Sequence, residues 1–304
     1  MPPRDRLLAL LVAVCWGVNF PATALGLQHF PPLLMVAVRF LLLAVPTVLL
    51  VPRPQVALRW FLGAAVFMST VQFALLYVAM ALGMPSGLAS LVLQACAPLT
   101  VVLGAVLLRE RLGRRQVVGV AAAVVGLGVI AVHRAVGGSA AALVPVLLTV
   151  AAGLGWALGN ICSRQAHPPK PLHFTLWLSV VPPVPLLALS LVVEGPHRDA
   201  EALRTALTLE ALPAVLGLLY IVLVATVLGY GLWNTLLSRN PAGVVAPFAM
   251  LVPVAGVLSS WLFLGEVPDL VELVAGALVV GGVLLGSRSS RAVDPAPALA
   301  LTRP

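Results

Sequence analysis

Polar and aromatic side chains recur three or four residues apart inside four long apolar stretches of the chain. Residues at these spacings share one face of a helix, so each set forms a polar stripe. The stripes comprise Cys15, Asn19 and Thr23; Ser86, Ser90 and Gln94; Trp156, Asn160 and Ser163; and Thr226, Tyr230 and Asn234 with Trp233 beside them. Amide and hydroxyl groups can replace the water around a small zwitterion, and an aromatic ring can cover its apolar part. The predicted chemistry is therefore reversible binding of a small solute.

The candidate solute-binding residues combine these stripes with further polar and aromatic side chains of the apolar stretches. They are Trp16, Asn19, Arg39, Gln72, Tyr77, Ser90, Gln94, Trp156, Asn160, Tyr230, Trp233 and Asn234. Helix packing is the alternative role for the hydroxyl and amide groups, since hydrogen bonds between membrane helices contribute about 0.6 to 2 kcal/mol each. The aromatic residues could likewise belong to a core or to an interfacial belt. Both interpretations stay open from the sequence alone.

Arg39 lies about eight residues inside an apolar stretch. If that stretch spans a membrane, placing a guanidinium at this depth costs about 2.5 to 3.5 kcal/mol on insertion scales. Two roles could justify the cost. Arg39 is either an anchor for a solute carboxylate or a structural residue that snorkels outward to headgroups or to a helix end.

The sequence predicts no catalytic residue, metal site or cofactor. A serine nucleophile elbow, an HExxH motif and a CxxC pair are all missing, and the five histidines never fall at ligand spacing. Cys15, Cys96 and Cys162 are odd in number and unpaired in spacing, so we expect them to be small buried hydrophobes. A membrane-embedded enzyme is therefore disfavoured.

The elements that must position these residues are membrane-spanning helices. Hydrophobic residues make up 61% of the chain and charged residues 9%, whereas soluble domains are nearer half apolar and a quarter charged. A spanning helix needs roughly 20 apolar residues, and ten stretches are long enough. They cover residues 7–26, 32–51, 58–80, 85–108, 115–132, 142–163, 172–193, 211–236, 242–264 and 270–287. The predicted fold is an all-α polytopic membrane protein, with a short interfacial helix within 199–207.

The distribution of basic residues predicts the orientation of these spans. All but four of the 18 Lys and Arg residues fall at the same ends of the spans; the exceptions are Arg39, Arg134, Arg198 and Arg204. Basic residues near span ends stay on the cytoplasmic side, so both termini are expected in the cytoplasm. The net charge of +8 is thereby explained as a topology signal. No nucleic-acid partner is expected, because the basic residues are scattered through short loops.

An internal repeat divides the ten spans into two units of five. Residues Pro85, Gly87, Glu110 and Gly126 recur 156 positions later as Pro241, Gly243, Glu266 and Gly282, and Trp16 recurs 140 positions later as Trp156. An insertion of about the size of segment 194–210 reconciles the two offsets. An odd number of crossings inverts the second unit, so Glu110 is expected on the cytoplasmic side and Glu266 on the far side. Inverted repeats place a solute site near the midplane, where the units can rock against each other.

The chain also resembles the EamA branch of the drug/metabolite transporter superfamily. The matching stretches are VCWGVNF at 14–20, RF at 39–40, GMPSGLASLVLQ at 83–94, ERL at 110–112, GWALGNI at 155–161, ATVLGYGLWNTLL at 225–237 and MLVPVAG at 250–256. The resemblance implies ten transmembrane helices arranged as two inverted five-helix repeats, 1–135 and 140–288, followed by a disordered cytoplasmic tail at 289–304. It further implies export of small amino-acid-like metabolites, such as cysteine or O-acetylserine, across a bacterial inner membrane.

Several alternatives to this function stay open. A carrier of nucleotide-sugars or drugs on the same scaffold would be expected to have more basic residues than Arg39 alone in its spans. The ten acidic residues lie in loops or near span ends, which favours a facilitator over a proton antiporter unless an edge group such as Glu272 couples transport. The expected partners are a small-molecule substrate and the lipid bilayer. A single chain is sufficient for the two halves, and a dimer stays open.

Overall fold

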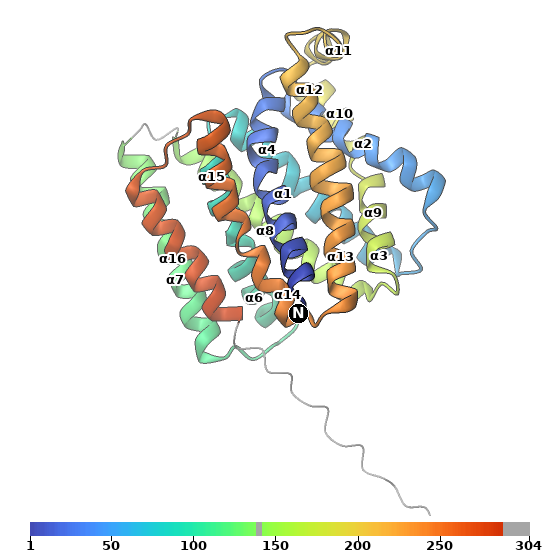
Figure 1. The fold of residues 1–304 in the computed structure, drawn as a ribbon. Helices are drawn as coiled ribbons and strands as arrows, with labels where there is room; N and C mark the ends of the chain where they lie inside the picture. Colours follow the sequence, from blue (N-terminus) through green and yellow to red (C-terminus); the bar gives the residue numbers. More distant parts are fainter. Residues whose placement is uncertain (138–141, 288–304) are drawn as a thin grey trace, which may run out of the picture.

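The computed structural model describes residues 1–137 and 142–287, and every regular element in these two segments is a helix (Figure 1). The first unit comprises α1 (Pro3–Leu27), α2 (Pro32–Leu50), α3 (Leu58–Ala64), η1 (Ala65–Val71), α4 (Gln72–Ala81), α5 (Ser86–Val92), η2 (Leu93–Ala95), α6 (Cys96–Leu107) and α7 (Arg114–Gly137). The second comprises α8 (Leu143–Ala166), α9 (Pro171–Trp177), η4 (Leu178–Val180), α10 (Pro183–Val193), α11 (Pro196–Arg204), α12 (Leu212–Leu219), η5 (Tyr220–Leu228), α13 (Gly229–Arg239), α14 (Ala242–Ala249), α15 (Val252–Leu264) and α16 (Leu270–Ser287).

The ten predicted spans are confirmed within the described residues, since ten helical segments are long and apolar enough to cross a bilayer. Their outward faces carry large apolar side chains such as Leu49, Val136 and Val192, which are 75%, 81% and 82% exposed. A soluble protein rarely exposes so continuous an apolar surface. The chain is therefore a multi-pass membrane protein. The tail predicted at 289–304 lies outside the described residues.

The two units run in opposite directions through the bundle. Figure 1 shows that α6 ends at the face where the N-terminus lies, whereas its counterpart α15 ends at the opposite face. We call these the N-terminal face and the far face. Five spans in each unit require this inversion, as the repeat predicts.

Several spans are broken at positions related by the repeat. The third span contains the π-helical segment η1 and the eighth contains the π-helical segment η5. The fourth span breaks at η2, four residues before Pro98, and the ninth breaks at 250–251, just before Pro253. A proline cannot donate a backbone hydrogen bond and its ring clashes with the carbonyl four residues earlier, which explains these two breaks. Pro21 causes no such break, since α1 continues through it.

Glycines bring neighbouring spans into close contact. A Cβ added to Gly282 of α16 would lie 2.5 Å from the carbonyl oxygen of Gly119 in α7. A Cβ added to Gly159 of α8 would lie 2.4 Å from the Cβ of Met68 in η1. The Gly155/Gly159 and Gly282/Gly286 pairs therefore lie where neighbouring spans pack closely.

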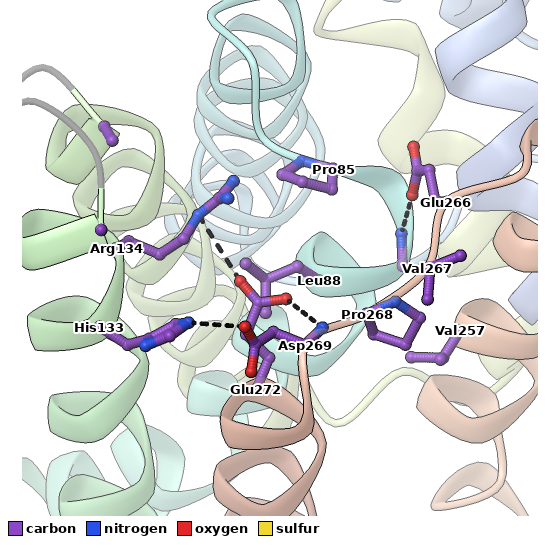
Figure 2. Close-up of a pocket in the computed structure, with 13 residues that line it drawn as sticks. Pro85, Leu88, His133, Arg134, Val257, Glu266, Val267, Pro268, Asp269 and Glu272 are labelled. Atoms are coloured by element: carbon purple, nitrogen blue, oxygen red, sulfur yellow. Dashed lines mark hydrogen bonds and ion pairs between the residues drawn. The ribbon is translucent and has the colours of Figure 1, made fainter.

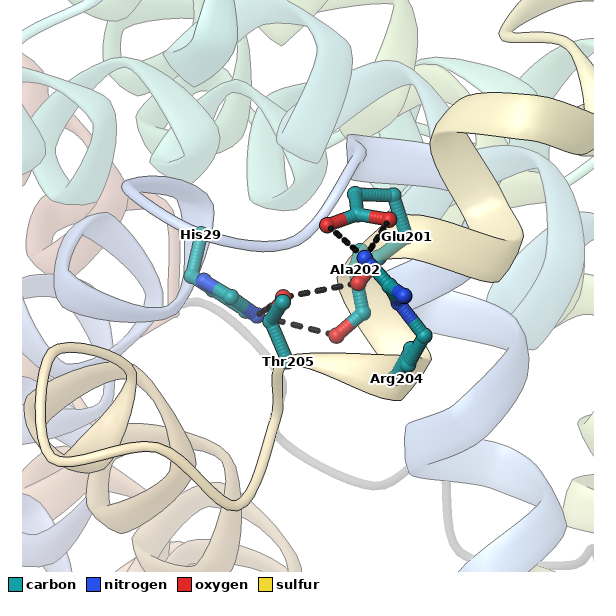
Figure 3. Close-up of polar contacts among 5 residues, drawn as sticks. All are labelled: His29, Glu201, Ala202, Arg204 and Thr205. Carbon is teal, nitrogen blue, oxygen red and sulfur yellow. Dashed lines mark hydrogen bonds and ion pairs between the residues drawn. The ribbon is translucent and has the colours of Figure 1, made fainter.

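The far face carries the short helix α11, which overlaps the segment 199–207 that was predicted to form a short interfacial helix. Figure 3 shows that α11 is tied to the loop after α1, where the His29 ring contacts the Ala202 carbonyl at 2.9 Å. Glu201 and Arg204 form an ion pair on its exposed side. The hydrogen bond from Arg204 holds the pKa of Glu201 below its ordinary value. On the same face, Glu194 accepts hydrogen bonds from the Leu33 and Leu34 amides at the start of α2, at 2.8 and 3.1 Å.

Candidate functional site

A cavity of about 550 Å³ lies between the two units, where the broken spans meet. Its walls come from α1, α2, α4, α5, η2, α6, α8, η5, α13, α14 and α15. The lining residues are Trp16, Asn19, Phe20, Arg39, Gln72, Phe73, Leu76, Ser90, Leu93, Gln94, Cys96, Ala97, Thr100, Val101, Trp156, Asn160, Ala225, Tyr230, Trp233, Ala249, Met250 and Val252. Thr100 and Val101 lie on α6, which runs toward the N-terminal face (Figure 1). The cavity therefore extends from the breaks toward that face.

The opposite end of the cavity is closed by tightly packed backbone. A Cβ added to Gly17 would lie 2.5 Å from the Cβ of Ala255, and one added to Gly256 would lie 2.5 Å from the Ser90 hydroxyl. Ser90 donates to the Gly87 and Pro253 carbonyls at 2.6 and 3.3 Å. These contacts seal α5 and α1 against α15 on the side of the far face.

Arg39 is the charged residue of the cavity lining, and its side chain points inward. It is 4% exposed; Nη1 donates to the Tyr77 hydroxyl at 2.9 Å and Nη2 to the Thr226 hydroxyl at 3.2 Å. The guanidinium carbon lies 4.1 Å from the centroid of the Phe73 ring, within the range of a cation–π interaction. No carboxylate pairs with Arg39 among the described residues. Of the two alternatives left open by the sequence, outward snorkelling does not fit, because neutral hydrogen-bond acceptors and an aromatic ring hold Arg39 at the cavity.

Three aromatic rings form a cluster on the cavity wall. The Trp16 ring lies 5.2 Å from those of Tyr230 and Trp233, tilted by 53° and 51°. The Trp16 indole donates to the Ala225 carbonyl at 2.9 Å, inside η5. This bond fixes the ring on the π-helical segment, whose carbonyls are not all used by the helix itself.

Polar atoms near the cavity are left without partners. The amide oxygens of Asn19 and Gln72 and the Arg39 Nε atom are buried and form no hydrogen bond within the described residues. An unpaired buried polar atom costs about 1 to 3 kcal/mol. Asn160, in contrast, donates to the Thr100 hydroxyl at 3.3 Å. The cavity thus combines one unneutralised cation, polar atoms with free capacity and an aromatic wall, which can bind a small anion or zwitterion.

All but two of the predicted solute-binding residues line this cavity. Tyr77 is fully buried behind Arg39 and contacts it through the hydroxyl. Asn234 donates to the Tyr230 carbonyl and lies outside the lining. Thr226 and Tyr230 both lie beside Arg39, as the stripe predicted. Asn234 is four residues further along α13 and does not reach the cavity.

Some lining residues were not predicted from the sequence. Phe73 and Thr100 are the ones with specific contacts, to Arg39 and Asn160. The position of Phe73 directly after Gln72 was the available signal, because adjacent residues of a broken helix can both reach a cavity. Thr100 lies four residues after Cys96, a spacing that places both side chains on one face of the helix that follows Gln94.

A second cavity of about 360 Å³ opens at the far face and has charged walls (Figure 2). His133 and Arg134 of α7 pair with Asp269 and Glu272 at 3.3 and 3.7 Å. Glu266 also lines it and reaches the start of α5. This cavity was not predicted from the sequence. No group of three or more metal-ligating side chains was found in the part of the chain that the structure describes.

Two inverted five-span units around a cavity that opens to one face define a membrane transporter of the inverted-repeat class. The chain belongs to the EamA-like transporter family, whose sequence model matches residues 6–132 and 143–288. The two matches correspond to the two structural units. The family consists of transporters, so the protein is a transporter and not an enzyme.

Curated relatives and a solved structure support this assignment. A protein of Salmonella typhimurium strain LT2, named "Probable amino-acid metabolite efflux pump", is 41% identical and covers 94% of this chain and 95% of its own length. An Escherichia coli strain K12 protein of the same name is 38% identical with the same coverage. A "Probable terminal-alkyne amino-acid exporter" of Streptantibioticus cattleyicolor is 27% identical over 92% of each chain. A crystal structure with 18% identity superposes with a TM-score of 0.59 over 96% of this chain and 100% of that chain, which supports the fold.

Proposed function

We propose that this protein exports small amino-acid-like metabolites by alternating access. The names of the Salmonella, Escherichia and Streptantibioticus relatives indicate amino-acid metabolites as the substrate class. The single observation that carries the proposal is Arg39, a buried cation at the cavity that has no carboxylate partner in segments 1–137 and 142–287. A substrate carboxylate would neutralise it through charge-assisted hydrogen bonds.

The rest of the cavity suits a substrate with a short side chain. Asn19 and Gln72 supply amide groups near Arg39, and Trp16, Tyr230 and Trp233 supply rings for an apolar part or for an ammonium group. Trp156, Asn160, Gln94 and Ser90 complete the proposed substrate site. A nucleotide-sugar or another larger phosphorylated ligand is less suited, because Arg39 is the one cation among the lining residues.

We place the chain in a bacterial inner membrane with both termini in the cytoplasm, because the basic loops lie at the N-terminal face. Residues 1–135 and 140–288 act as the two transport halves, so a monomer is sufficient. In this orientation the cavity opens to the cytoplasm, the side from which an exporter loads its substrate.

The same arrangement supports facilitated export. None of the described residues that line the cavity is acidic, so the substrate site itself offers no carboxylate that could exchange a proton for substrate. The accumulated solute is expected to leave the cell down its own gradient.

The test is efflux from proteoliposomes that contain the purified chain. Vesicles loaded with labelled O-acetylserine or cysteine should lose the solute several-fold faster than protein-free vesicles, with no pH difference imposed. Intracellular and extracellular amino-acid pools, measured with and without expression, provide the cellular readout. Equal loss from both vesicle types, over a panel of amino acids, would overturn the substrate class. Loss that requires an imposed pH gradient would overturn the facilitator.

A further inference from the structure

A carboxylate at the far face holds the start of the fourth span closed. Glu266 follows α15 and accepts hydrogen bonds from the Ser86 and Gly87 amides at 3.1 and 3.0 Å (Figure 2). It also accepts from the Ser86 hydroxyl at 3.0 Å. Free amides at a helix N-terminus carry partial positive charge, so an anion there is stabilising. Glu266 thus ties the second unit to the first at the closed end of the cavity.

Glu110, the repeat counterpart of Glu266, has the same backbone setting at the N-terminal face. The residue before each glutamate has a positive φ, 55° at Arg109 and 67° at Gly265. The Glu110 amide donates to the Gly104 carbonyl at 3.3 Å, and the Glu266 amide donates to the Ser260 carbonyl at 3.4 Å. Gly104 and Ser260 are themselves repeat counterparts. Both units therefore present a carboxylate from the same turn at the end of a span.

The two carboxylates differ in what they bind. Glu110 accepts a hydrogen bond from Arg164 at the end of α8 and does not bind a helix start. The side chains of both residues in this ion pair are about half exposed, and such pairs contribute only about 0 to 1 kcal/mol to stability. Arg164 is therefore a partner from which Glu110 can be released at small cost.

The start of α5, which Glu266 caps, and the start of α14, its repeat counterpart, also differ in how closely they are packed. A Cβ added to Gly87 would contact Ser260 and Val257 at 3.4 Å, because α5 packs on α15. A Cβ added to Gly243, the counterpart of Gly87, would meet nothing within 4 Å. The α14 helix packs on α1 and α13, and Val101, the counterpart of Val257, lines the open cavity. The fourth and ninth spans are joined at the far face and apart at the N-terminal face.

We propose that Glu266 and Glu110 are reciprocal gate residues of the transport cycle. Glu266 closes the far face when it caps α5, as observed here. When the far face opens, Glu110 leaves Arg164 and caps the Ala242 and Gly243 amides of α14, which closes the N-terminal face. This inference rests on the alternating access of the proposed function, but it does not depend on the identity of the substrate.

The inverted repeat provides the physical reason for the exchange. The same hinge turn, the same carboxylate and the same proline-led helix start occur in both units, so the closed contact seen at one face can form at the other. A contact available to only one state at a time shifts the population toward that state. Each glutamate therefore stabilises one of the two end states by capping a helix, and the exposed pair of Glu110 with Arg164 contributes little to the other.

The test measures access to the cavity in the absence of substrate. Val101→Cys is introduced after the three native cysteines are replaced by alanine, and a membrane-impermeant maleimide is added to the N-terminal face of sealed vesicles. Glu266→Gln should lower the labelling rate of this reporter at least about threefold, because the far-face contact is weakened. Glu110→Gln should keep or raise the rate while slowing transport. The double variant should return the rate toward the parent value.

Glu201→Gln is the matched control, since Glu201 is an exposed carboxylate near the far face that bonds to Arg204 on its own helix. It should change neither labelling nor transport, and size-exclusion profiles verify that each variant is folded. An unchanged rate in Glu266→Gln, or a lowered rate in Glu110→Gln, would overturn the gate assignment. Because labelling needs no substrate, that result is distinct from a failure of the proposed substrate class.

Discussion

Arg39 is stabilised at the cavity by neutral groups that leave its charge available. Tyr77 and Thr226 each accept one hydrogen bond, and the Phe73 ring lies beneath the guanidinium. A carboxylate in place of Tyr77 and Thr226 would hold the Arg39 guanidinium equally well but would neutralise its charge. Hydroxyls and a ring orient the guanidinium and keep its remaining donors free. This arrangement makes Arg39 suited to recognise a carboxylate that comes and goes.

We predict that Arg39→Gln lowers export of amino-acid-like substrates about 10- to 100-fold. A hydrogen bond to a charged group contributes about 1.5 to 3 kcal/mol, and each 1.4 kcal/mol is a factor of ten in binding. Arg39→Lys should keep part of the activity, because lysine retains the charge but cannot reproduce the forked contacts. Efflux rates and equilibrium binding to purified protein measure both effects.

Arg59→Gln is the control for this prediction, since Arg59 is exposed and lies outside the cavity. It should export at the parent rate. Export by a folded Arg39→Gln variant at the rate of this control would remove Arg39 from the substrate site.

The residue types of the site could be read from the sequence, but their directions could not. Spacing places Asn19, Gln94 and Asn160 on helix faces that line the cavity. The inward direction of Arg39 depends on Tyr77 and Thr226, which come from other spans and leave no local signal. The sequence therefore indicates which polar residues need partners, and tertiary packing decides which partners they find.

At the scale of elements, the breaks within spans shape the cavity. The breaks at η2 and at 250–251 are encoded by Pro98 and Pro253, and residues beside both breaks line the cavity. The π-helical segments η1 and η5 have no comparable signature, since neither contains proline. Their extra residue per turn could therefore not be predicted from the sequence.

The adjacent glycines Gly281 and Gly282 give a matched test of helix packing in α16. A Cβ at Gly282 would lie 2.5 Å from the Gly119 carbonyl oxygen, whereas one at Gly281 meets nothing within 4 Å. Gly282→Ala should therefore destabilise the protein by about 1 to 3 kcal/mol, through a backbone clash between α7 and α16. Gly281→Ala should be neutral, or stabilising by up to about 1 kcal/mol, because alanine favours the helix.

Thermal unfolding of the two purified variants in the same detergent measures this difference. A midpoint for Gly282→Ala equal to that of Gly281→Ala would show that the α7 and α16 backbones are farther apart than described.

At the scale of the whole molecule, the sequence predicted most of the fold. Apolar length placed the ten spans, and the recurrence of Glu110 as Glu266 predicted two inverted units. These features follow from the bilayer, which demands length and closed backbone hydrogen bonding whatever the side chains do. These demands of the bilayer do not determine which face of the cavity is open. The two end states are built from equivalent contacts, and small packing differences between the units select one of them.

The orientation of the whole molecule can be tested by labelling from one side of the membrane. Before residue 288, every basic residue except Arg39, Arg134, Arg198 and Arg204 lies toward the N-terminal face, where the cavity opens, and moving such residues across a membrane is opposed during insertion. In a background without native cysteines, Glu201→Cys should react with an impermeant maleimide on intact spheroplasts, whereas Arg59→Cys should react only after permeabilisation. The reverse pattern would place the cavity opening outside the cell and make the observed state the one that releases an exported solute. Labelling of both positions from one side would contradict the inverted topology itself.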